Sequence, residues 1–94
     1  MVVCDVTAGT LTVTSFNGIT ITGDTGGSGI VVANATFDAT AGVPYNQVAG
    51  GTTAVGTLAN PVGGAGVVLA TVSGDLAFTD LDIFSANGAA LASS

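Results

Sequence analysis

The sequence predicts an all-β fold, and three observations carry this prediction. First, the 94-residue chain contains 15 Gly, 14 Thr and 13 Val but no Glu, Lys or Arg. Second, apolar and polar residues alternate over several short stretches. Third, the phrase "GGSGIVVAN" at 26–34 returns as "GGAGVVLAT" at 63–71. Threonine and valine favour strands, whereas surface helices need long straight side chains, which this chain lacks.

The first predicted strands lie within residues 9–23, "GTLTVTSFNGITITG". Leu11 and Val13 alternate with threonines, and Ile19 and Ile21 do the same. Alternation of this kind places apolar side chains on one face of a strand and hydroxyls on the other. The residues between the two stretches, "SFNG" at 15–18, form a predicted corner because Asn and Gly tolerate positive φ.

Further strands are expected at 29–39 and 66–84, with a shorter one within 86–92. In the second of these stretches the alternation shifts by one residue near Thr79, which indicates a corner or a bulge. The segment 40–62 is the least periodic part of the chain and holds both prolines. We therefore expect a loop excursion there around one or two short strands.

The repeated glycine phrase predicts stacked coils. Its two copies are long enough, and far enough apart, to mark the same corner in successive turns of the chain. Glycine suits a sharp corner because it adopts positive φ at little steric cost. In such a stack Ile30 and Val32 would lie against Val67 and Leu69 at the spacing of neighbouring strands, about 4.8 Å. A phosphate-binding loop fits poorly, because a strand-like run follows the glycines instead of a helix.

"GGAGVVLATVSGDLAFTDLDIFSANGAAL", preceded by "GGSGIVVANATF", resembles the right-handed parallel β-helix repeats of bacterial surface and secreted proteins, including autotransporter-like passengers. The resemblance implies a short solenoid of about three coils and an extracellular or cell-surface location. Residues 1–94 would form a single solenoid domain or a fragment of one. The alternative fold is a β-sandwich, since a chain of this length with several short strands also suits that class.

The charge inventory excludes several partners. The chain has six aspartates and no Lys, Arg or His, giving a net charge of −6. Without cations it cannot neutralise phosphates, so we expect no nucleic-acid binding. An anionic membrane surface would repel it, and no convincing apolar helix suggests membrane insertion. The missing His and Lys also remove the usual general bases.

Asp80 and Asp82, in "TDLDIF", are the candidate metal ligands. Residues two apart in a strand project from the same face, so the two carboxylates could help to hold Ca²⁺. Adding Asp75 would give a cluster of three, which a polysaccharide-active enzyme could use as acid and base. The alternative is that these charges keep a solenoid wall soluble. No other cofactor and no catalytic residue is expected.

Two other residues have open roles. Tyr45, in "VPYNQV", is either a recognition contact on the loop or a side chain that packs back onto the wall. Cys4 is the only cysteine, so it forms no internal disulfide.

The leading functional expectation is a non-enzymatic structural or adhesion module that assembles through exposed solenoid ends. A solenoid of three coils has ends nearly as large as its walls, and neither terminal stretch has the polar composition of a cap. Its partners would be further coils or copies of itself, with a surface glycan or protein as another possibility. The alternatives are a fragment of a polysaccharide-active β-helix enzyme and a β-sandwich interaction domain.

Overall fold

The computed structural model describes residues 2–6, 9–13, 17–22, 26–40, 45–48 and 51–94. In this part of the chain the fold is all-β, as the sequence predicts, and contains no helix. None of these residues therefore belongs to a helix that could cross a membrane. The strands are β1 (Val2–Asp5), β2 (Thr20–Ile21), β3 (Ile30–Ala33), β4 (Gln47–Val48), β5 (Thr53–Val55), β6 (Val67–Ala70), β7 (Ala77–Phe78), β8 (Leu81–Ile83) and β9 (Leu91–Ser93).

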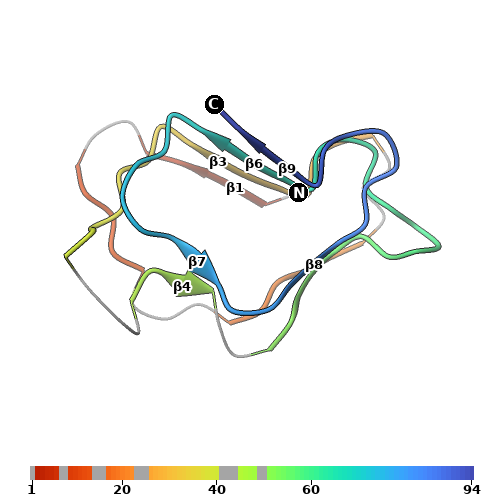
Figure 1. Cartoon of the computed structure of the whole chain (residues 1–94), viewed down its shortest axis with the longest axis horizontal. Coiled ribbons are helices and arrows are strands. Elements are labelled where there is room, and N and C mark those ends of the chain that lie inside the picture. The colour runs from red at the N-terminus through yellow and green to blue at the C-terminus, as the bar shows by residue number, and fades with distance from the viewer. Residues whose placement is uncertain (1, 7–8, 14–16, 23–25, 41–44, 49–50) are drawn as a thin grey trace.

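The strands form three sheets. The largest has the order β1-β3-β6-β9, the second β2-β5-β8, and the third pairs β4 with β7. All strand pairings and isolated bridges among the described residues are parallel. Figure 1 looks along the direction in which the strands of each sheet succeed one another, and the sheets surround a common interior.

Neighbouring strands of a sheet are never consecutive in the chain, because the chain visits the other sheets before it returns. In the largest sheet the paired positions are 28, 37 and 24 residues apart, from Val2 to Ile30, from Ile30 to Val67 and from Val67 to Leu91. We call each such passage, from one strand of this sheet to the next, a rung. The molecule measures 39 × 26 × 15 Å, and the view in Figure 1 is along the shortest axis.

The longest rung includes the segment 40–62. The sequence predicts one or two short strands there, and the structure places β4 and β5 within it. Both strands belong to sheets, since β4 pairs with β7 and β5 lies between β2 and β8. This segment therefore supplies part of the walls and does not only form a loop beside them. Its residues 41–44 and 49–50 lie outside the described residues.

The predicted register of the repeated phrase is confirmed. Ile30 pairs with Val67, and Val32 pairs with Leu69. Backbone hydrogen bonds extend the match upstream, since the Ile30 amide donates to the Gly66 carbonyl at 2.9 Å. Like residues therefore lie one above the other along the stack.

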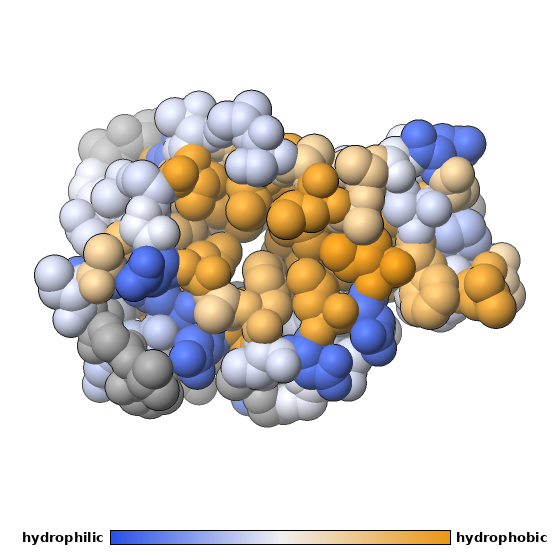
Figure 2. All heavy atoms as spheres, in the orientation of Figure 1, coloured by the Kyte–Doolittle hydropathy of each residue, from blue (hydrophilic) through white to orange (hydrophobic). Residues whose placement is uncertain are grey.

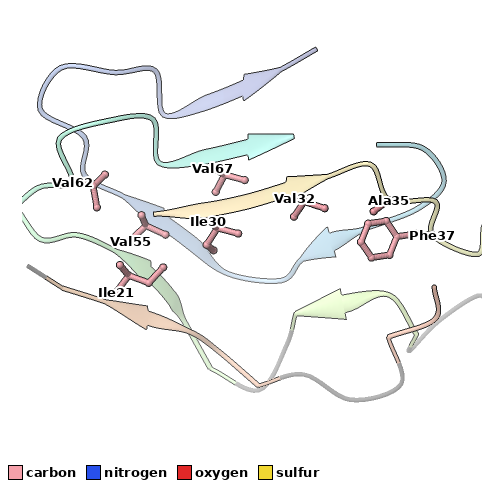
Figure 3. Close-up of a cluster of buried hydrophobic side chains, with 8 residues drawn as sticks. All are labelled: Ile21, Ile30, Val32, Ala35, Phe37, Val55, Val62 and Val67. Carbon is pink, nitrogen blue, oxygen red and sulfur yellow. The ribbon is translucent and has the colours of Figure 1, made fainter. Parts of the chain in front are cut away.

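The core lies between the sheets and is filled mainly by the middle rung (Figure 3). Val55 and Val62 are completely buried, and Val67 is 1% exposed. The core side chains are Ile21, Ile30, Val32, Ala35, Phe37, Val55, Val62 and Val67. Because most are valine and isoleucine from two-to-four-residue strands, the interior is narrow and each methyl group in it matters.

The glycines of the repeated phrase have a different role from the predicted one. Gly29 and Gly66, the last glycines of the two copies, are not in the positive-φ region. Instead, a Cβ on Gly29 would collide with the Val55 side chain and lie 2.7 Å from the Gly66 carbonyl oxygen. A Cβ on Gly66 would likewise collide with Ile83 and lie 2.7 Å from the Ala90 carbonyl oxygen. The phrase repeats because two sheets approach closely at this point in each rung.

The corner predicted near Thr79 is present. β7 ends at Phe78 and β8 begins at Leu81, so Thr79 and Asp80 connect two different sheets. The predicted corner at 15–18 falls partly outside the described residues, because 14–16 are not among them.

We predict that Gly29→Ala lowers the free energy of unfolding by about 1–3 kcal/mol, the usual cost of overpacking a core. The added methyl group would meet both Val55 and a backbone oxygen, and the latter cannot rotate away. Urea denaturation followed by circular dichroism measures the change.

Gly26→Ala is the matched control, since a Cβ at this position has no other atom within 4 Å. This variant should change stability by less than about 0.5 kcal/mol. Equal destabilisation by both substitutions would contradict the close-approach explanation.

Candidate functional site

The three aspartates proposed from the sequence do not form one cluster. Among the described residues, no three acidic, cysteine or histidine side chains come together in a way that could hold a metal ion. Asp82 is exposed within β8, whereas Asp80 lies in the corner before that strand. Asp75 lies before β7, on a different sheet.

Asp80 has a partner within the chain. The Thr52 hydroxyl donates a hydrogen bond of 2.6 Å to Asp80 Oδ2, and the Thr53 amide donates one of 2.8 Å to the Asp80 carbonyl oxygen. These bonds join the start of β5 to the corner before β8. Asp80 therefore has a structural role that the sequence spacing did not indicate.

Asp75 instead lines a pocket of about 370 Å³. The pocket lies beside β4 and β7, because Gln47 of β4 and Ala77 of β7 are among its lining residues. Two rungs contribute to it. The pocket is lined by Asp38, Tyr45, Asn46, Gln47, Gly74, Asp75, Leu76 and Ala77. We call it the wall pocket.

Asn46 holds the wall pocket together. It is only 3% exposed and has a φ of 56°. Its Oδ1 accepts a hydrogen bond of 2.7 Å from the Val13 amide, and its Nδ2 donates one of 2.8 Å to the Asp38 carbonyl oxygen. Its backbone carbonyl also accepts a bond of 2.8 Å from the Ala77 amide. One buried residue therefore connects three rungs, and asparagine tolerates the left-handed conformation that this requires.

Gly74 forms the opposite side of the pocket. Its φ is +85°, and a Cβ there would collide with the backbone of Phe37. Here both the conformation and the close approach demand glycine. Gly74 thus brings the 74–77 segment against the segment that follows Phe37.

Asp38 is the second carboxylate of the wall pocket. Its Oδ1 accepts hydrogen bonds from the Thr40 hydroxyl at 2.7 Å and from the Thr40 amide at 2.9 Å. These bonds stabilise the charged form and lower the pKa of Asp38 below its ordinary value. The carboxylate therefore stays ionised to lower pH than an ordinary aspartate.

Tyr45 lies at the same pocket and is 43% exposed. Of the two roles left open by the sequence, this placement favours a contact surface, because much of the ring remains accessible. Sequence reasoning missed Asn46 and Asp38. The one available signal was "PYNQ" itself, in which an asparagine stands where a tight turn would need positive φ.

A smaller apolar cavity of about 90 Å³ lies between the sheets. Cys4 contributes to its lining, and this thiol is partly buried. The remaining lining is aliphatic or aromatic and includes Leu11, Phe37 and Phe78. Cys4 thus behaves as a small apolar residue of the core edge.

The end of the stack that carries β9 has an apolar centre. Figure 2 looks onto the end that carries β9, where hydrophobic side chains occupy the middle of the face and polar ones surround them. The last rung contains partly buried hydrophobic residues that pack against the core, among them Leu69, Leu76, Phe78, Leu81 and Ile83.

Comparison with known proteins finds no family model, no curated protein and no solved structure that matches this chain. The chemistry of the wall pocket and of the two ends must therefore be argued from their own residues.

We predict that Asn46→Ala destabilises the fold by about 2–4 kcal/mol, because it removes two hydrogen bonds and leaves buried backbone groups without partners. Asn34→Ala is the control. Asn34 also has a positive φ of 53°, but it is exposed, and its side chain bonds to Asp5 alone among the described residues. It should cost about 1 kcal/mol, the strain of the conformation alone. Equal losses in thermal or urea unfolding would contradict the linking role of Asn46.

We also predict that Thr40→Ala raises the pKa of Asp38, because the hydroxyl that stabilises the carboxylate is lost. Since the pKa of Asp38 is depressed in the folded protein, its contribution to stability is present above the unfolded pKa. That contribution is lost as the pH falls through the folded pKa. Carboxyl ¹³C NMR titration measures the shift. Thr57→Ala, which removes an exposed hydroxyl elsewhere, should leave the Asp38 titration unchanged.

Proposed function

We propose that this chain is a segment of a right-handed parallel β-helix that serves as a non-enzymatic structural or adhesion module of a bacterial extracellular or surface protein. It assembles through the ends of its stack. The extracellular location rests on the resemblance to β-helix repeats, and the assembly rests on the structure of the two ends.

The solenoid reading is supported by the parallel pairings. A β-sandwich is built from antiparallel strands, many of them joined by hairpins, whereas here every described pairing joins strands from different rungs. The right hand follows from a general rule, since crossover connections between parallel strands are right-handed in nearly all proteins.

The gradient of burial along the stack carries the proposal. One inward column of the largest sheet contains Val2, Ile30, Val67 and Leu91. Ile30 is 4% exposed and Val67 1%, but Leu91, at the end of the same column, is 58% exposed. Val2, at the other end, is only partly buried. Side chains of one column are thus buried in the middle of the stack and more exposed at its two ends.

The two ends are different surfaces of one ladder. β1 and β9 are its outer strands, and neither has a second partner strand among the described residues. A further copy that places its β1 along β9 would continue the parallel ladder and cover Leu91 with apolar groups. Contacts that join the front of one copy to the back of the next do not close on themselves, so they produce open arrays.

A structural role also suits the chain's chemistry. With no His, Lys or Arg, the residues available for acid-base work are few, and Asp75, Asp80 and Asp82 belong to separate surroundings. Calcium binding by Asp80 and Asp82 stays a hypothesis, and among the described residues no third acidic side chain joins these two carboxylates in a metal-binding group.

We predict that the wild-type chain associates with rising concentration and that Leu91→Asp and Val2→Asp each weaken this association at least tenfold. The loss reflects one apolar side chain no longer buried and one carboxylate placed in an apolar contact. Sedimentation velocity over a range of concentrations measures the size distribution. A wild-type chain that stays monomeric throughout this range would overturn the proposal.

Mixing the two variants tests the direction of assembly. Each variant keeps one intact end, so a mixture should form dimers but no assemblies of more than two copies. Leu58→Asp is the matched control, because Leu58 is 85% exposed but lies on the 57–60 loop, outside the strands that form the two ends. This variant should assemble like the wild type.

A further inference from the structure

The lining of the wall pocket includes neither Val2 nor Leu91, the two residues that the assembly test alters. Its lining comes from the segments 38, 45–47 and 74–77 on the side wall beside β4 and β7. What binds there is therefore a separate question, and its answer does not depend on the assembly.

The charge of the wall pocket selects the sign of its ligand. Asp38 and Asp75 both line it, and the chain has no Lys, Arg or His that could neutralise them. Charges interact more strongly near a protein surface than in bulk water, because the effective dielectric constant is lower there. An anionic ligand would therefore be repelled by the two carboxylates, while a cationic one would be attracted.

Tyr45 adds an aromatic face to the two carboxylates. Its ring is 43% exposed at the pocket. A cation lying over such a ring is attracted by its quadrupole, and arginine does this most often because its planar group also stacks. Gln47 also lines the pocket, and its amide group can accept a hydrogen bond without adding charge.

Hydrogen bonds and a close backbone approach position the groups around the pocket, and such preorganisation lowers the cost of binding. The side-chain amide of Asn46 is already hydrogen-bonded to the backbone of Val13 and Asp38. Asn46 therefore positions the pocket, and the residues around it contact the ligand. Asp38 is oriented in turn by Thr40, and Gly74 fixes the segment that carries Asp75.

We propose that the wall pocket binds the guanidinium group of an arginine side chain on a partner protein. The planar fork donates to the carboxylates of Asp38 and Asp75, and the ring of Tyr45 stacks on it. Lysine presents a compact charge without this fork, so it binds less well. The pocket of about 370 Å³ leaves room for the aliphatic stem of the side chain.

The chain carries its own reporter for this test. Tyr45 is the only tyrosine and there is no tryptophan, so tyrosine fluorescence reports on the wall pocket alone. The probe is the peptide acetyl-Gly-Arg-Gly-amide, titrated at low salt. Versions with lysine and with uncharged citrulline in place of arginine serve as comparison ligands. We expect the arginine peptide to bind best, the citrulline peptide to bind at least fivefold more weakly, and added salt to weaken binding.

Two variants distinguish the contribution of the pocket to binding from that of the overall charge. Asp75→Asn and Asp82→Asn change the net charge equally, but only Asp75 lines the pocket. We expect Asp75→Asn to weaken binding of the arginine peptide about fivefold and Asp82→Asn to have less than a twofold effect. The Tyr45 variants lack the fluorescent tyrosine ring, so their binding of the arginine peptide is measured by calorimetry. Tyr45→Ala should weaken binding about threefold, and Tyr45→Phe should retain it.

Three results would overturn the proposal: no binding of the arginine peptide, equal binding of the citrulline peptide, or equal effects of Asp75→Asn and Asp82→Asn. Because neither Val2 nor Leu91 lines the wall pocket, arginine binding should be unchanged in Val2→Asp and Leu91→Asp. A failure of end-to-end assembly would therefore not decide whether the wall pocket binds arginine.

Discussion

The close approach of neighbouring sheets at Gly29 and Gly66 is the constraint on which the rest of the structure depends. Each glycine lets the side chain of the facing sheet, Val55 or Ile83, pack directly against the backbone of the largest sheet. With side chains at these positions the sheets would stand further apart, and the short valines and isoleucines of the interior would no longer fill the space between them. The narrow core, the in-register columns and the burial of the middle rung all follow from this spacing.

A single buried asparagine complements that apolar packing. Asn46 satisfies backbone groups of Val13 and Asp38 that a longer, less regular rung would otherwise leave without partners. Its fixed geometry also brings Asp38, Tyr45 and Asp75 to one pocket. The same residue therefore accounts both for the stability of the irregular wall and for the most featured part of the surface.

Much of the fold could be predicted from sequence, because strand preference and repetition are local signals. The pairing of Ile30 with Val67 and the corner near Thr79 followed from the repeated phrase and the shift in alternation. The reason for the glycines could not be predicted, since the close approach involves Val55 and Ile83, which both belong to another sheet. The wall pocket was missed for the same reason: Asp38 and Asp75 are distant in sequence, and only the parallel stacking brings them together.

The thinness of the molecule has an electrostatic consequence for any array that it builds. The chain carries a net charge of −6 within a shortest dimension of 15 Å. Copies stacked along that direction would carry one negative charge per roughly 2.5 Å of length, close to the one per 1.7 Å of duplex DNA. Such a fibre would be a polyelectrolyte. Its growth would draw counterions out of solution, so that dissolved salt would act as a component of the assembly.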